Sequence, residues 1–245
     1  MPGLYRDEGI VLRTIKLGEA DRIVTFLTRG HGKVRAVAKG VRKTSSRFGA
    51  RLEPTSRVAL QCYQGRELDV VTQVETLEAN RALREEYVLL THAVPMLEAV
   101  DQIAQEREPN PALYRMLSRA LHTLAELRNP LVTPAFFWKL LSLEGFHPML
   151  DGCARCGNAP ETGDDDTELV AFDLDEGGTL CRACARGGGR PVSPAALELL
   201  RRMLGGALNG ALAEPPSTAT HEVEFLGVRA LEYHGERRLR SIALL

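Results

Sequence analysis

The chain has 245 residues, of which 44% are hydrophobic and 26% are charged, and its formal net charge is −1. It is long enough to bury a sizeable core in one large domain or a few small ones. No apolar run approaches the roughly 18 residues of a membrane-spanning helix, and the first residues lack the apolar region of a secretory signal. We therefore expect a globular, cytoplasmic protein without a membrane segment.

The charge is unevenly distributed along the chain. Residues 1–80 hold 14 Lys and Arg against 9 Asp and Glu, whereas residues 81–245 hold 17 against 23. The positive excess is concentrated between residues 29 and 57, where nine cations accompany a single carboxylate. A short charged run is usually just a solvated surface, but so strong an imbalance of sign favours binding of a nucleic acid.

Five strands are predicted in the amino-terminal part, because apolar and polar residues alternate there between turn-forming residues. Five short strands with a longer connection between the third and the fourth favour a small Greek-key barrel of the OB type. An SH3-like barrel is the alternative, and the turn residues do not separate the two. We expect a domain of residues 1–79, with strands at residues 10–17, 22–28, 33–39, 57–63 and 67–75.

The third strand and the connection after it carry most of the positive charge. In a strand, Lys33, Arg35 and Lys39 point to one face, about 6.7 Å apart at successive positions, which is roughly two nucleotide steps along one DNA strand. Val34, Ala36 and Ala38 then point to the other face. The following run from Gly40 to Gly49 is rich in Gly, Ser and cations, and is typical of a mobile loop that extends the same surface.

Aromatic residues are few in this region. Of Tyr5, Phe26, Phe48 and Tyr63, we expect Phe26 and Tyr63 to face the core. A sequence-tolerant single-strand binder usually stacks bases on several exposed aromatic rings. The composition instead predicts a surface that grips phosphates and leaves the bases free to pair, as strand annealing requires.

Beyond residue 77 the apolar period changes from that of a strand to that of a helix. Pro95 predicts a kink within the first long helix, and Thr133 and Ser193, each followed by Pro, predict helix starts. The chain is therefore expected to be of the α+β class, with an all-α domain over residues 80–245. Its helices are predicted at about residues 83–97, 113–127, 133–143, 193–208 and 222–240.

Two C-x-x-C pairs interrupt the helical part at about residues 149–190. Cys153 and Cys156 form the first pair, and Cys181 and Cys184 form the second, 24 residues further on. Two such pairs complete the tetrahedral thiolate shell that Zn²⁺ prefers, and four cysteines leave no position for a catalytic water. We therefore predict a structural zinc site, with a redox pair as the alternative. The fifth cysteine, Cys62, is expected to be a small buried hydrophobe.

No catalytic site is predicted. The run from Gly30 to Lys33 resembles the end of a P-loop, but it lacks the first glycine and the Ser or Thr that would hold Mg²⁺. His221 and Glu222 begin a zinc-protease motif whose second histidine is missing. An enzyme that acts on nucleic acid is therefore disfavoured.

Several runs of this sequence resemble the RecO recombination-mediator family. The amino-terminal runs are Gly18–Thr28, Gly32–Lys43 and Ser46–Gly49, followed by Leu52-Glu-Pro54. Glu144-Gly-Phe-His-Pro148 before the first cysteine pair and Arg237-Arg-Leu-Arg-Ser241 at the end fit the same family. The resemblance therefore extends over essentially the whole chain.

The resemblance implies an amino-terminal OB-fold and a helical carboxyl-terminal domain. It implies binding of single- and double-stranded DNA, annealing of complementary strands, and loading of the RecA recombinase together with a RecR clamp. It also implies contact with the acidic, apolar tail of the single-strand-binding protein (SSB) and action at the nucleoid. The DNA-binding residues that the family pattern implies are Arg22, Lys33, Arg35, Lys39, Arg42, Lys43 and Arg47, and the local charge adds Arg51.

A function of another class remains open at this stage. Four arginines surround the cysteines, so that the cysteine module itself could touch nucleic acid, as in a zinc-ribbon transcription or RNA-binding factor. These arginines are Arg155, Arg182, Arg186 and Arg190.

Overall fold

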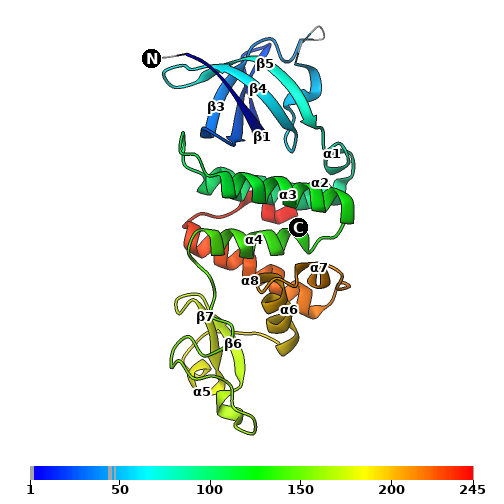
Figure 1. Ribbon diagram of the computed structural model, residues 1–245. Helices are drawn as coiled ribbons and strands as arrows, with labels where there is room; N and C mark the ends of the chain where they lie inside the picture. Colours follow the sequence, from blue (N-terminus) through cyan, green and yellow to red (C-terminus); the bar gives the residue numbers. More distant parts are fainter. Residues whose placement is uncertain (1–2, 44–45, 47, 245) are drawn as a thin grey trace. The chain divides into compact units, whose positions relative to one another are not determined.

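The computed structural model describes residues 3–43, 46 and 48–244. The chain forms two compact units, one of Met1–Pro130 with Leu239–Leu245 and one of Leu131–Arg238 (Figure 1). The boundary predicted at residue 79 falls inside the first unit, between the last strand of a barrel and the first helix. The division into domains of residues 1–79 and 80–245 thus stays a prediction.

The first unit begins with a closed, five-stranded barrel. Its strands pair in the order β1-β2-β3-β5-β4, and β1 also pairs with β4. β3 and β5 run parallel and pair only at Ala36–Asp69 and Val37–Val70. This is the predicted OB-type arrangement, which confirms the fold class of the amino-terminal part. The strands are β1 (Leu4–Leu17), β2 (Asp21–Thr28), β3 (Gly32–Ala38), β4 (Arg57–Tyr63) and β5 (Asp69–Glu78).

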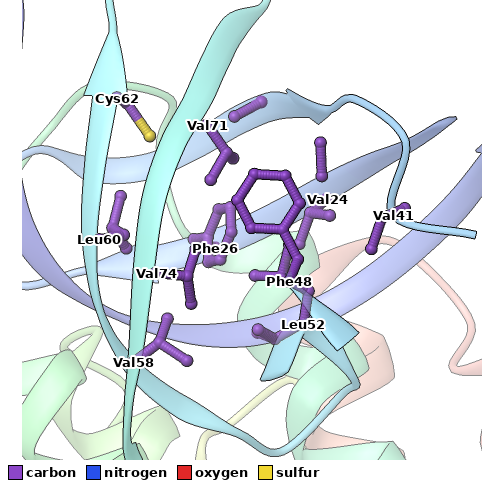
Figure 2. Packing of buried hydrophobic residues seen from close by; sticks show 13 residues of the cluster. Val24, Phe26, Val41, Phe48, Leu52, Val58, Leu60, Cys62, Val71 and Val74 are labelled. Carbon is purple, nitrogen blue, oxygen red and sulfur yellow. The ribbon is translucent and has the colours of Figure 1, made fainter. Parts of the chain in front are cut away.

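The connection from β3 to β4 closes one end of this barrel. Val41, Phe48 and Leu52 are buried in the barrel core, where Figure 2 shows them beside the inward side chains of the strands. Gly49–Leu52 forms a short 3₁₀-helix, η1, that carries Leu52 inward. The prediction of a mobile loop from Gly40 to Gly49 is therefore wrong at Val41 and Phe48, because burying these two side chains fixes the chain at both positions.

The aromatic predictions also need correction. Phe26 is buried as expected, but Tyr63 is 48% exposed. Because successive strand residues point to opposite faces, Cys62 takes the inward position in β4 and Tyr63 must point outward. Phe48 takes the buried place instead.

Three helices follow the barrel in the first unit: α1 (Ala82–Glu85), α2 (Tyr87–Ile103) and α3 (Pro111–Leu127). α2 continues through Pro95, and the side chain of Asn110 caps α3 by accepting the N–H of Leu113 at 3.0 Å. The final 3₁₀-helix, η3 (Arg240–Leu244), packs on α2, where Glu98 accepts the N–H groups of Arg240 and Ser241. The end of the chain thereby belongs to the first unit.

Residues 105–108, which we call the β3 strap, run beside the first half of β3. The N–H of Lys33 donates to the carbonyl oxygen of Gln105 at 3.2 Å, and the N–H of Arg107 donates to that of Lys33 at 3.0 Å. The guanidinium of Arg107 also lies 2.6 Å from the fully buried carboxylate of Asp69. The strap therefore covers the edge of β3 that β5 leaves unpaired.

The close fit of the strap makes Gly32 sensitive to substitution. Gly32 has φ +66°, and a Cβ there would lie 2.1 Å from the carbonyl oxygen of Glu108. We expect G32A to lower the free energy of unfolding of the first unit by about 3 kcal/mol or more, because strain at positive φ and a backbone clash combine. Urea denaturation followed by circular dichroism measures this.

Gly18 provides the matched control, since its φ is +58° and a Cβ would meet nothing within 4 Å. G18A should cost only about 1 kcal/mol, the strain of the left-handed conformation alone. The fluorescence of Trp138, the single tryptophan, reports on the second unit and should not change in either variant. Equal losses of unfolding free energy in G32A and G18A would show that the strap backbone does not restrict the side chain at position 32.

The second unit is built on four helices: α4 (Val132–Leu143), α6 (Pro194–Leu204), α7 (Leu208–Ala211) and α8 (Thr218–Gly235). Ser193 caps α6 as predicted, whereas α4 begins at Val132 with Leu131 at the N-cap, so the predicted cap at Thr133 is wrong. The buried Trp138 of α4 donates to the carbonyl oxygen of Val223 in α8 at 3.1 Å.

A small sheet, a short helix and the 3₁₀-helix η2 (Asp165–Thr167) also belong to the second unit. The sheet has the order β7-β6-β8, with β6 (Leu169–Asp173), β7 (Gly178–Cys181) and β8 (Arg190–Pro191), and α5 (Arg182–Ala185) follows β7 directly. Within the described parts of both units, no helix combines the length and the apolar character of a membrane span.

Candidate nucleic-acid interface and metal centre

Cations gather at the end of the barrel that the β3–β4 connection closes. We call this group the barrel-mouth cluster, and it comprises Lys16, Arg22, Lys39, Arg42, Lys43 and Arg51. All of them are exposed except Arg22, which is half-buried. Five were predicted from the sequence. Lys16 was missed because its place opposite Arg22 depends on the register of the β1–β2 pair, in which β2 begins at Asp21 and not at Arg22.

Backbone and side-chain contacts hold the cluster together. Arg22 lies opposite Ala38 in the β2–β3 pair, and Ala38 directly precedes Lys39 in the chain. The Arg42 guanidinium donates to the carbonyl oxygen of Glu19 at 2.9 Å, which ties the β3–β4 connection to the turn between β1 and β2. Arg22 forms an ion pair of 2.8 Å with Glu53, immediately after η1. The exposed Lys39, Arg42 and Lys43 thus lie beside a segment that these contacts connect to β2 and to the β1–β2 turn.

Two predicted DNA-binding residues lie elsewhere and are engaged by acids. Lys33 Nζ donates to the carbonyl oxygen of Asp101 at 2.6 Å and lies 3.9 Å from its carboxylate, and the Lys33 side chain is only 14% exposed. Arg35 lies 4.0 Å from Glu106 of the β3 strap. The predicted alternation of β3 is confirmed, but acids from outside the barrel partly neutralise its outward cations. Arg47 lies outside the described residues.

The four cysteines of the two C-x-x-C pairs come together in the second unit. All four Sγ atoms lie within 4.8 Å of one another, and those of Cys156 and Cys181 are 3.9 Å apart. A metal held tetrahedrally with bonds of about 2.3 Å separates its sulfur ligands by about 3.8 Å. These four residues therefore fit a tetrahedral metal ion.

Local structure explains why each pair presents its two sulfurs together. Gly157, at φ +79°, turns the first pair back so that its N–H donates to the carbonyl oxygen of Cys153 at 2.8 Å. In the second pair, Cys181 ends β7 and Cys184 lies in the helical turn of α5. The sheet and the short helix thus position the second pair against the first.

The thiols of the cluster differ in acidity. Burial raises the pKa of Cys153, but N–H groups of Cys181, Cys156 and Arg155 point at its sulfur and bring that pKa down to about 6. A hydrogen bond with Cys181, followed by burial, raises the pKa of Cys184 to about 12. The Cys153 thiol therefore ionises readily. A bound cation would favour ionisation of all four thiols.

Cys62 has a different role. Its side chain is fully buried in the barrel core, and burial raises the pKa of its thiol to about 12. It is inert packing, as the sequence indicated.

The arginines around the cysteines have intramolecular partners. Arg182 pairs with Glu168, Arg186 with Asp166, and the guanidinium of Arg190 lies 3.8 Å from the ring centroid of Phe225. Arg155 contacts Glu176 and Asp173. This charge balance weakens the alternative in which the cysteine module itself binds nucleic acid.

Comparisons with known proteins agree over the whole chain. Residues 1–80 match the family model for the recombination protein O N terminal region, and residues 84–242 match that for its C terminal region. A curated relative, the DNA repair protein RecO of Frankia casuarinae, is 42% identical over 246 residues, which covers 99% of this chain and 98% of the relative. With a barrel before a helical part and a cysteine cluster able to bind metal, the chain belongs to the RecO family of DNA repair proteins.

Proposed function

We propose that this chain is a non-enzymatic DNA-binding mediator of recombinational repair, and that it anneals complementary single strands. The observation that carries the proposal is the barrel-mouth cluster, in which Lys39, Arg42 and Lys43 are exposed together and Arg42 is hydrogen-bonded to the turn between β1 and β2. Cations held in this way bind the phosphate backbone through counterion release and need no base contact. A strand bound through its backbone keeps its bases available for pairing.

The predicted DNA-binding residues contribute unequally in this proposal. Lys39, Arg42, Lys43 and Arg51 are exposed and form the main contact, together with Lys16. Arg22 supports them, since Glu53 already neutralises part of its charge. Lys33 and Arg35 contribute at the margin because of their pairs with Asp101 and Glu106.

Family membership supports the proposed partners. In this proposal the chain acts with a RecR-type clamp to load the RecA recombinase onto DNA coated by SSB, in the cytoplasm and at the nucleoid. The acidic, apolar tail of SSB needs cations beside apolar surface. The second unit offers such chemistry where the exposed Phe146 and Met149 border a cavity of about 330 Å³, and Leu174 links it to a second cavity lined by Arg229 and Arg237.

We further propose that the metal is Zn²⁺ and that its role is structural. Cys153, Cys156, Cys181 and Cys184 would hold it, and their thiolates are the ligands that zinc prefers. Four protein ligands leave no open coordination position for a substrate or a reactive water. The ion would supply a cross-link among the cysteine loop, β7 and α5.

An annealing assay tests the proposed function. Two complementary labelled oligonucleotides, each coated with SSB, are mixed with and without the protein in the absence of ATP. We expect faster pairing by fluorescence energy transfer, with strands of unchanged length on a denaturing gel. Unchanged pairing would contradict a mediator, and cleaved or joined strands would contradict a non-enzymatic role.

A further inference from the structure

We infer that Arg155 positions the metal centre by clamping the two cysteine pairs together. The inference rests on the proposed metal site. Arg155 lies within the first pair, between Cys153 and Cys156, and its guanidinium reaches the main chain of the second pair. Nη1 donates to the carbonyl oxygen of Cys184 at 2.8 Å. This side-chain contact joins two segments that are 29 positions apart in the sequence.

The same guanidinium is fixed from its other side. Nε donates to Glu176 at 2.8 Å in the turn between β6 and β7, and Nη2 lies 3.7 Å from Asp173 at the end of β6. The Asp173 carboxylate accepts the N–H of Asp175 at 2.9 Å, which holds that turn in place. A planar guanidinium with directed donors at fixed angles suits such a role better than a flexible ammonium.

The main chain also makes room for the clamp. A Cβ at Gly187, which follows the second pair, would lie 3.2 Å from Nη1 of Arg155. With glycine at this position the guanidinium reaches Cys184 without the shift of a few tenths of an ångström that a Cβ would require. Three separate features of the sequence thus meet at one point: an arginine inside the first pair, acids around the β6–β7 turn, and a glycine after the second pair.

Charge gives Arg155 a second effect. Four thiolates around a divalent cation leave a centre with two net negative charges, and a neighbouring cation offsets part of this excess. An arginine is charged at any ordinary pH, and the hydrogen bond to Glu176 raises the pKa of Arg155 further. Of the other arginines near the cysteines, Arg182 and Arg186 pair with acids and Arg190 lies over the ring of Phe225, whereas Arg155 donates to the carbonyl oxygen of Cys184.

Zinc release from the full-length protein tests the inference. The zinc-loaded wild type, R155A and R155K are mixed with a chromophoric chelator, and the release rate is followed at several pH values. Loss of a residue that orients metal ligands typically costs 10- to 100-fold in affinity. We expect release from R155A to be at least about tenfold faster, with metal loss beginning at higher pH as protons compete for the thiolates. R155K keeps the positive charge but loses the planar guanidinium, so its release rate should lie between those of the wild type and R155A.

R182A is the matched control, because Arg182 follows Cys181 directly but pairs with Glu168. Its release rate should stay within about twofold of wild type. The fluorescence of the buried Trp138, which lies in the second unit, confirms that this unit has folded in each variant. Equal release from zinc-loaded R155A and wild type would overturn the role of Arg155 and leave the metal site intact. A folded wild type that takes up no zinc would overturn both proposals.

Discussion

Replacing Lys39 and Lys43 together by glutamate should weaken binding of a single-stranded oligonucleotide at least about tenfold at low salt. Both side chains are exposed in the barrel-mouth cluster. Each substitution removes a phosphate contact and places a carboxylate where a strand would lie. Since a contact to single-stranded DNA contributes about 0.7 to the slope of log affinity against log salt concentration, losing two should reduce that slope by about 1.4. Fluorescence anisotropy titrations at four salt concentrations measure both quantities.

The matched control is R115E/R119E on α3. Both arginines are exposed, and the double substitution changes the formal charge by the same amount. An effect of net charge alone would appear equally in the two variants, whereas a local binding surface predicts a loss only in K39E/K43E. If K39E/K43E binds like the wild type with an unchanged salt slope, the DNA surface does not lie at the barrel mouth.

Removing Cys153 and Cys181 together should abolish metal binding and unfold the cysteine module of the second unit. These are the two most buried members of the cluster, at 0% and 3% exposure. Structural zinc contributes an apparent 10–16 kcal/mol in small zinc-binding peptides, on the order of the whole stability of a typical domain. Elemental analysis of the purified proteins should give one zinc per wild-type chain and none in C153A/C181A.

Hydrogen exchange locates the structural effect. We expect loss of protection in β6, β7 and α5, whose positions the cysteines fix, and retained protection in the barrel, which belongs to the other unit. C62A controls for the loss of a cysteine as such, because Cys62 is buried in the barrel core and should leave the zinc content unchanged. Full zinc content in C153A/C181A, or a folded metal-free wild type with four free thiols, would contradict the assignment.

Features that depend on neighbouring residues could be predicted from the sequence. The alternation of Lys33 to Ala38 predicted which side chains β3 buries, because strand geometry alone decides it. Ser193 followed by Pro194 predicted the start of α6, because a hydroxyl acceptor and a fixed φ suit the first turn of any helix. The two C-x-x-C pairs predicted the cysteine cluster, because a thiol pair at this spacing lies within one turn.

Features that depend on distant contacts could not be predicted in this way. Nothing near Lys33 indicates that Asp101 will reach it, since the two are 68 positions apart. The strap that brings acids to β3 depends on where α2 ends and on a glycine at position 32 that admits its backbone. We expected a row of outward-facing cations along β3. The structure instead places the exposed cations at the barrel mouth.

The β3–β4 connection shows a related difficulty. Its Gly, Ser and cations are typical of a loop, and they outnumber the two apolar residues Val41 and Phe48, so the local composition predicts a loop. The decisive fact is that the barrel has an open end that needs apolar side chains to fill it, and this emerges only once five strands have closed. Phe48 was therefore predicted in a mobile loop although it is buried, and Tyr63 was predicted in the core although it is exposed.

Barrel closure also limits how other proteins can attach to the first unit. Each of the five described strands has a hydrogen-bonded strand on both sides, and the β3 strap occupies the part of β3 that β5 does not reach. An incoming chain thus finds no free backbone donors and acceptors along the part of β3 that the strap occupies, and cannot extend the sheet there. A protein that docks at this part of β3 must recognise side chains or turns instead, and this edge should not promote edge-to-edge aggregation at high protein concentration.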